Sequence, residues 1–245
     1  MTLSPDEIVY FTLGPLNVSA TLVFTWVTML LLIVVSVLVT RGLKVMPPIG
    51  RGQHAFEALV TFLLGEIEAV TGQDPKRYLP FVGTLFLFIV TSNVLSIVPG
   101  FEPPTGSLMT TGALAVAVFL AVPGFGIARV GVRGYLRGYL EPSPFMLPFT
   151  IIGEFTRTLA LAMRLFGNIM SGTVIVSILL AITPLFFPVI MQAFGLLIGV
   201  IQAYIFAVLA IVYIASGTSE TEKRLAKDGG ANGAPADRAA EGGNA

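Results

Sequence analysis

The chain is poor in reactive and charged side chains. It contains no cysteine, a single histidine (His54) and only 11% charged residues among 245, with a formal net charge of zero. The lack of cysteine excludes disulfides and thiolate sites, one histidine cannot form a histidine metal cluster, and zero net charge argues against a nucleic-acid partner. No glycine-rich phosphate loop, paired-carboxylate site or nucleophile elbow is recognisable. We therefore predict that this chain has no catalytic site, cofactor or metal of its own.

Hydrophobic residues dominate the chain instead. They make up 55% of it, and the mean hydropathy is +0.87, whereas ordinary soluble domains carry about 25% charged residues. Because a membrane-spanning helix needs about 20 apolar residues, the sequence predicts an all-α integral membrane protein with about five membrane helices and one amphipathic helix. The expected spans are 22–40, 79–98, 108–127, 145–182 and 185–216, and the amphipathic helix is 52–71.

The last two apolar regions are longer than one crossing requires, and Thr183-Pro184 separates them. Such length predicts strong tilt, and proline disfavours helix at the residue before it, so we expect the two regions to form a tilted helical hairpin. Residues 22–218 are expected to be a single membrane domain, between an outside N-terminal segment, 1–21, and a disordered cytoplasmic tail, 219–245. This orientation follows from the positive-inside rule, because basic clusters follow the first and third spans and precede the second, whereas the turn after the second span carries only Glu102.

The region 145–182 carries two arginines at bilayer depth. A charged side chain at the bilayer centre costs about 2.5–3.5 kcal/mol on insertion scales, so such a residue usually faces water, an ion path or a partner carboxylate. Steps of three and four residues share a helical face, which predicts one polar stripe here: Glu154, Arg157, Leu161, Arg164, Asn168 and Ser171. Glu154 and Arg157 can pair with each other, whereas Arg164 has no acid within one turn and must find its partner elsewhere.

The region 185–216 offers a second polar stripe with similar spacing: Gln192, Gly195, Gly199 and Gln202. Glycines permit close helix approach, so two facing stripes describe either a buried helix pair or the lining of an ion path. Asn93 and Gln202 can equally serve as interhelical hydrogen-bonding groups, and Arg157 as an interfacial anchor. The residues alone therefore indicate an ion-linked membrane protein. They leave open a secondary transporter, although no inverted repeat is recognisable, and a non-conducting membrane scaffold.

Several segments of the chain resemble one known family. Arg164-Leu-Phe-Gly-Asn168, preceded by Glu154-x-x-Arg157, resembles the signature of subunit a of F-type ATP synthases. The runs 92–100 and 201–213 also resemble segments of that family, and the latter resembles its last helix. The resemblance covers about residues 20 to 218, with the segments in the right order.

This resemblance implies a function. Subunit a is the stator of the membrane motor; it faces a rotating ring of c subunits, each with a carboxylate in mid-membrane, and two offset half-channels lead to that ring. Arg164 matches the arginine that separates the half-channels and favours the ionised carboxylate. Gln202 matches a polar residue near that arginine, and Asn168 one that lines the path. The implied partners are the c-ring, b-type stator subunits, the rest of the ATP synthase complex, the lipid bilayer and the transported H⁺ or Na⁺, in a bacterial plasma membrane.

The sequence departs from the family at several positions. Nine residues after Arg164, where the family often has an acid or a histidine, this sequence has Thr173. Seven residues before Gln202, where the family often has the complementary member of that pair, it has Gly195. Asn93 also stands where some relatives have an acid, so the chain is similar to the divergent bacterial lineage called N-type. Such a channel could conduct through water, or conduct Na⁺ through hydroxyls, amides and carbonyls. The residues that we expect to serve ion translocation are Arg164, Asn168, Gln202, Asn93, Gln192, Glu154, Arg157, Ser171 and Thr173.

Overall fold

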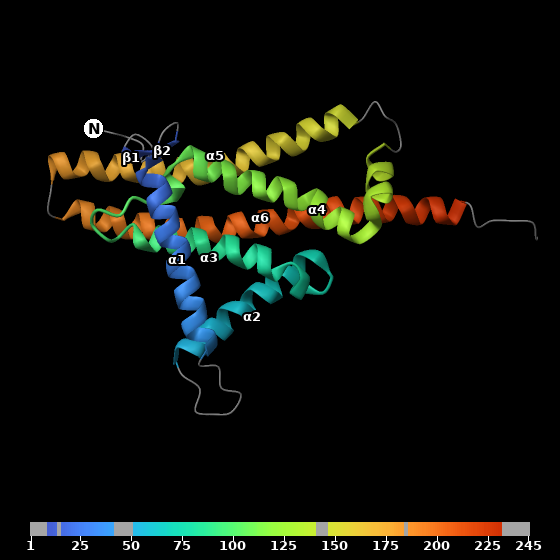
Figure 1. Cartoon of the computed structure of the whole chain (residues 1–245), viewed down its shortest axis with the longest axis horizontal. Helices are drawn as coiled ribbons and strands as arrows, with labels where there is room; N and C mark the ends of the chain where they lie inside the picture. The colour runs from blue at the N-terminus through green and yellow to red at the C-terminus, as the bar shows by residue number, and fades with distance from the viewer. Residues whose placement is uncertain (1–8, 14–15, 42–50, 141–146, 184–185, 232–245) are drawn as a thin grey trace, which may run out of the picture.

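Helices dominate the computed structural model, which describes residues 9–13, 16–41, 51–140, 147–183 and 186–231 (Figure 1). Its elements are β1 (Val9–Leu13), β2 (Leu16–Ser19), α1 (Ala20–Arg41), α2 (Arg51–Thr71), α3 (Leu79–Leu95), α4 (Leu108–Leu140), α5 (Leu147–Ile182) and α6 (Phe187–Ala231), with short 3₁₀ turns η2 (Pro75–Arg77) and η3 (Pro104–Gly106). α1, α5, α6 and the first part of α4, Leu108–Arg129, are long and apolar enough to cross a bilayer. The predicted helical membrane architecture is confirmed, with one small addition: β1 and β2 form an antiparallel hairpin ahead of α1.

The two longest helices, α5 and α6, run antiparallel and in contact with each other (Figure 1). Their apolar stretches cover 32 residues, Ile151–Ile182, and 31 residues, Phe187–Gly217. At 1.5 Å per residue each stretch is about 47 Å long, against roughly 30 Å of bilayer hydrocarbon. The predicted hairpin is confirmed, and helices of this length must tilt steeply to stay within a membrane.

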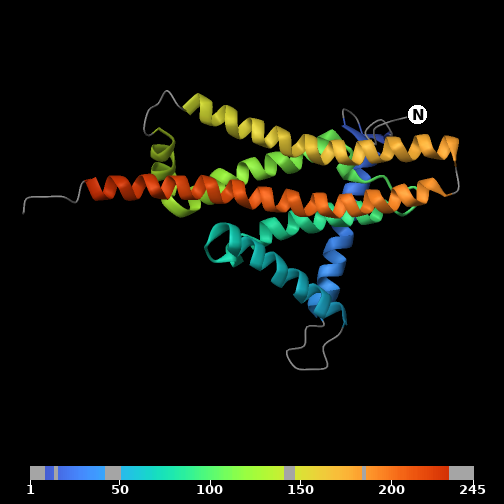
Figure 2. The ribbon, with the colours of Figure 1, turned by 180° about the vertical axis from the view of Figure 1, so that it is seen from behind.

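The centre of the packing is α6. It contacts α2, α3, α4 and α5, and Figure 2 shows α6 in front with α5 alongside it. The buried positions in its middle combine small and large side chains: Ala203, Phe206, Ala207, Ala210, Ile211 and Ile214. Small residues at such contacts let helices approach closely, which favours association in a membrane, where apolar burial alone contributes little. The amphipathic α2 joins the same core through Leu63 and Ile67.

α3 ends earlier than the sequence predicts. The expected span 79–98 becomes a helix of 17 residues that ends at Leu95. Two features of the sequence stop it: Pro99 disfavours helix at the preceding residue, and the hydroxyl of Ser96 donates to the carbonyl oxygen of Asn93 at 2.6 Å, which competes with the helical pattern. The chain then turns back, and η3 is buried against the bundle. This early stop brings the turn after α3 into the candidate site.

Two helices extend further than predicted. α4 continues past residue 127 to Leu140, with a break at Gly131, whose φ of +76° and ψ of 163° are readily adopted only by glycine. α6 continues to Ala231, so the prediction of a disordered tail from residue 219 is wrong as far as that residue. Residues 220–226 consist mainly of Glu, Lys, Arg, Leu and Ala, which are strong helix formers even without an apolar stripe. The rest of that predicted tail, and residues 1–8 of the predicted N-terminal segment, lie outside the described residues.

Candidate ion-translocation site

A buried polar crossing joins α3 to α6. Asn93, in the last turn of α3, is only 4% exposed, and its Nδ2 donates to the carbonyl oxygen of Gly199 at 2.8 Å. Its Oδ1 accepts a hydrogen bond of 3.3 Å from the hydroxyl of Thr105 in η3, and the hydroxyl oxygens of Thr105 and Ser92 lie 3.2 Å apart. An amide inside a membrane needs such partners because an unpaired polar group there is costly. The crossing thus ties the turn after α3 to the middle of α6.

The close approach at this crossing depends on Gly199. A Cβ at this position would lie 3.0 Å from Nδ2, 3.1 Å from Cγ and 3.2 Å from Cβ of Asn93. The sequence correctly predicts a close helix contact at this glycine. The partner, however, is α3, whereas the facing polar stripes of the sequence analysis would place α5 there.

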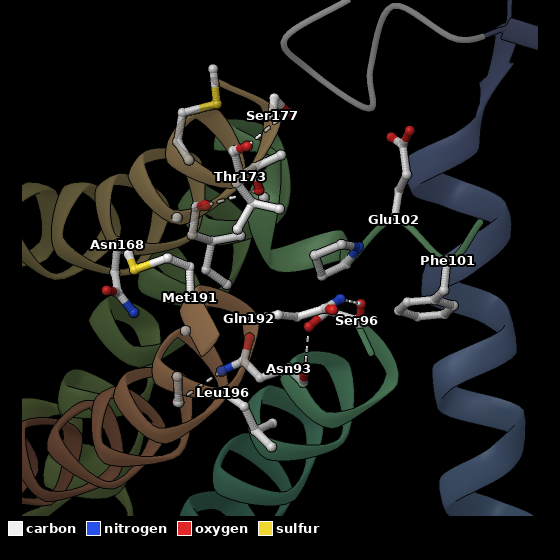
Figure 3. A pocket seen from close by; sticks show the side chains of 18 residues that line it. Asn93, Ser96, Phe101, Glu102, Asn168, Thr173, Ser177, Met191, Gln192 and Leu196 are labelled. Atoms are coloured by element: carbon white, nitrogen blue, oxygen red, sulfur yellow. Dashed lines mark hydrogen bonds between the residues drawn. The ribbon is translucent and has the colours of Figure 1, made fainter. Parts of the chain in front are cut away.

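A pocket of about 260 Å³ lies beside this crossing, between α3, the turn before α4, α5 and α6 (Figure 3). Its polar lining comes from four segments of the chain: Asn93 and Ser96; Glu102; Asn168, Thr173 and Ser177; and Gln192. Gln192 also bridges two of these segments, because its Nε2 donates to the carbonyl oxygen of Ser96 at 3.4 Å. Four of the predicted residues, Asn93, Asn168, Thr173 and Gln192, therefore meet in one place.

The pocket also contains positions at which the sequence departs from the pattern of the family that it resembles. Thr173 and Gly195 both line it, although they lie on different helices. A hydroxyl and a glycine thus stand in one space. The two positions therefore belong to the same environment.

Arg164 lies in the middle of α5 with its side chain exposed. Within the described part of the chain, no residue forms a hydrogen bond or ion pair with it, and it is outside the lining of the pocket. Arg157 and Ser171, seven residues away on either side, are exposed as well. Leu161 of the predicted stripe is instead buried, at 1% exposure. The exposed part of the stripe is therefore narrower than predicted and contains both arginines.

Arg157 makes a contact that the sequence did not predict. Its guanidinium carbon lies 5.9 Å from the ring centroid of Tyr213 on α6, within the range of a cation–π interaction. The contact fits the anchoring role considered for this arginine. Glu154 is half-buried one turn earlier, where its carbonyl oxygen accepts from the hydroxyl of Thr158 at 2.9 Å; its pairing with Arg157 stays a prediction.

Gln202 is buried, at 7% exposure, and its Nε2 has no hydrogen-bond partner among the described residues. Such a group is rare and points to a role or a missing partner. Two residues further along α6, the hydroxyl of Tyr204 donates to Oε2 of Glu66 on α2 at 2.8 Å. Sequence reasoning missed this pair because 138 residues separate its members, and no local pattern relates them.

Comparisons with known proteins identify what this arrangement serves. The family described as "ATP synthase A chain" matches residues 22–215. The chain is 54% identical over 228 residues to "ATP synthase subunit a 2" of Acaryochloris marina, covering 93% of this chain and 97% of that one. The chain belongs to the ATP synthase subunit a family. It is also 55% identical over 224 residues to "ATP synthase subunit a 2" of a Picosynechococcus species, covering 91% and 96%, and 56% identical over 218 residues to "ATP synthase subunit a" of Albidiferax ferrireducens, covering 89% and 94%.

As a subunit a, the chain is the ion-conducting stator component of the membrane sector of an F-type ATP synthase. It is a multi-pass membrane protein and a subunit of a larger ATP synthase complex. The family membership confirms the resemblance seen in the sequence. It also decides against the secondary transporter and the non-conducting scaffold that the residues alone left open.

Proposed function

We propose that Arg164 meets the carboxylates of a c-subunit ring on the exposed face of α5 and keeps two ion paths apart. The observation that carries this proposal is an arginine in mid-helix without a partner among the described residues, on an apolar surface. Phe155, Leu159 and Met163 on the same helix are each at least 50% exposed. A guanidinium stays protonated in such surroundings, and a nearby positive charge favours the ionised form of a carboxyl group. Arg164 therefore promotes ion release from each passing carboxylate and blocks direct passage between the two paths.

The pocket beside the α3–α6 crossing is our candidate for one of the two access paths. Asn93, Asn168, Thr173 and Gln192 supply its amide and hydroxyl groups. Without the acid and histidine of many relatives, ions would pass through water, hydroxyls and amides. Gln202, whose Nε2 has no partner in the described part of the chain, is available to donate to a water further along α6.

In this proposal the N-terminus faces the outside and the C-terminus the cytoplasm of a bacterial plasma membrane. Gln73, in the loop before α3, accepts hydrogen bonds from both Arg129 and the hydroxyl of Tyr78, the latter at 2.9 Å. The loop that carries Lys76 and Arg77 therefore meets the end of the first part of α4. η3 and the start of α1 lie at the other end of α3, where the rings of Phe24 and Phe101 are 4.8 Å apart. The positive-inside rule assigns the basic end to the cytoplasm.

The partners that we propose are the c-ring, b-type stator subunits and lipid, with H⁺ or Na⁺ as the transported ion. We further propose that the chain is of the N-type lineage. Thr173 and Gly195 in the pocket support this assignment. The numbered name of the Acaryochloris marina relative, which fits a second copy of the subunit in that organism, supports it too.

ATP-driven ion uptake by inverted membrane vesicles that carry the whole complex tests the role of Arg164. Arg164→Ala should abolish uptake while the complex still assembles. Arg164→Lys should impair it, because an ammonium keeps the charge but loses the planar fork of the guanidinium. Arg133→Ala removes another exposed arginine, from α4, and should transport normally as the matched control.

Two results would refute this role. One is uptake by Arg164→Ala equal to that of the wild type, and the other is failure of both Arg164 variants to assemble, which would make the residue structural. Where uptake depends on Arg164, its response to Na⁺ and to an uncoupler identifies the transported ion.

A further inference from the structure

We propose that Glu102 is the cation-attracting group of the pocket between α3 and α6, and that cations from the side of the α3–α4 turn gather there before they reach the rotor. The inference rests on the proposed function of this pocket as an access path. Among the described residues that line the pocket, Glu102 is the only ionisable one. No arginine or lysine of the described chain lines the space to oppose its charge.

Glu102 lies at the rim of the pocket. Figure 3 shows its carboxylate on the side of the pocket near α1, pointing away from Asn93 and Ser96. The side chain is half-buried and has no hydrogen-bond or ion-pair partner in the described part of the chain. Its charge is therefore available to an ion that approaches the pocket.

The turn that carries Glu102 is held firmly on both sides. The ring of the preceding residue, Phe101, lies 4.8 Å from that of Phe24 on α1, in an edge-on contact. On the other side Pro104 is buried, and Thr105 donates to Asn93. A carboxylate between two such anchors keeps its place at the pocket without a partner of its own.

Most of the other polar groups in the lining offer acceptors, although the amides of Asn168 and Gln192 also carry N–H donors. The hydroxyls of Thr173, Ser177 and Ser96 each donate to a carbonyl oxygen of their own segment, at 3.0, 2.8 and 2.6 Å. A hydroxyl has one hydrogen to donate and two lone pairs, so each of these oxygens is left with acceptor capacity only. The amide oxygen of Gln192 adds another acceptor, since its Nε2 donates to Ser96.

A space in which one carboxylate and several oxygen acceptors outnumber the amide donors, and which no basic side chain of the described residues lines, favours a small, hard cation. Such cations prefer oxygen ligands, and a hydrated proton donates hydrogen bonds to the same groups. This chemistry is shared by Na⁺ and H₃O⁺. Glu102, in the α3–α4 turn, thereby supplies a negative charge. Neither Thr173 on α5 nor Gly195 on α6 supplies one.

The expected effect is on apparent affinity rather than on maximal rate. At roughly 6 Å in a medium as polar as water, one negative charge raises the local concentration of a monovalent cation about threefold, and more where the medium is less polar. Glu102→Gln should therefore raise the half-saturating cation concentration about threefold or more. At saturating cation the access step is filled in both forms, so the maximal rate should be unchanged.

The test uses inverted vesicles carrying the whole complex, in which the lumen corresponds to the outer side. ATP synthesis is driven by a fixed membrane potential, and the lumenal cation is varied in two series: pH at constant Na⁺, and Na⁺ at constant pH. The series in which Glu102→Gln shifts the half-saturation point identifies the cation. Glu102→Asp should recover most of the wild-type value. Glu68→Gln, which removes an exposed carboxylate on α2 outside the pocket lining, is the control and should shift neither series.

The dependence of the half-saturating cation concentration on ionic strength separates an electrostatic effect of Glu102 from a structural defect. The screening length falls from about 8 Å at 0.15 M salt to about 3 Å at 1 M, so added choline chloride should shrink the difference between Glu102→Gln and wild type. Unchanged half-saturation in both series, or a lower maximal rate with unchanged half-saturation, overturns the inference about Glu102. Arg164→Ala keeps the two proposals apart when its ATP-driven ion uptake is measured in vesicles of the same kind: uptake that survives in that variant overturns the proposed function itself.

Discussion

Replacing Gly199 by alanine tests the helix crossing on which the pocket is built. The new Cβ would lie 3.0 to 3.2 Å from three atoms of Asn93, which is buried and held by hydrogen bonds to Gly199 and Thr105. Overpacking of this kind costs about 1–3 kcal/mol, and loss of an interhelical hydrogen bond in a membrane adds about 0.6 kcal/mol. Alanine also gains about 1 kcal/mol over glycine in helix propensity, which offsets part of the loss.

Gly195→Ala is the control, because it brings the same gain in helix propensity as Gly199→Ala. It lies one turn earlier on α6, and a Cβ there meets nothing within 4 Å. The stabilities of the two variants should therefore differ by about 1.5–3.5 kcal/mol. The assay is the denaturant dependence of the release of this subunit from the detergent-solubilised complex.

A double variant makes the prediction more specific. Asn93→Ala removes two of the three crowded atoms, so Asn93→Ala combined with Gly199→Ala should cost less than the sum of the two single changes. Equal stability of Gly199→Ala and Gly195→Ala would refute the reasoning, as would strict additivity in the double variant.

Two further predictions concern contacts away from the pocket. Tyr204→Phe should lower stability by about 0.5–1.5 kcal/mol in the same assay, because it removes the hydrogen bond to Glu66; a variant as stable as the wild type would show that this bond contributes nothing. Gly131→Ala should cost about 1–3 kcal/mol, because the φ of +76° at this break in α4 disfavours any side chain. Gly124→Ala, at an open position on the same helix, should be neutral or stabilising, and equal losses in both variants would contradict the assigned strain.

The sequence predicted the type and order of the helices well, because long apolar runs have one outcome in a bilayer. It was less successful at their ends. Apolar periodicity carries no information on the polar continuation of α6 to Ala231, and the early stop of α3 at Leu95 depends on Ser96 and Pro99 inside an otherwise apolar run. Such ends are decided by single residues and local hydrogen bonds, which a hydropathy pattern does not register.

The same contrast applies to the site. The motif around Arg164 identified the family from adjacent residues, because those residues are close along the chain. The pairing of α6 with α3 through Asn93 and Gly199 joins positions 106 residues apart, and the bond between Glu66 and Tyr204 joins positions 138 apart. Periodicity assigns residues to a helix face but does not name the helix that this face meets.

By itself the sequence determined that this chain is a helical membrane protein, that it belongs to the subunit a family, and that a charged arginine lies within an apolar helix. Composition and local motifs suffice for these conclusions because each depends on residues within one segment. Only the tertiary structure decided which polar residues share a pocket, that Thr173 and Gly195 line the same space, and that Glu102 is its one ionisable lining residue in the described chain. These facts depend on how four segments pack against one another, and that packing is set by shape and hydrogen bonding between distant parts of the chain.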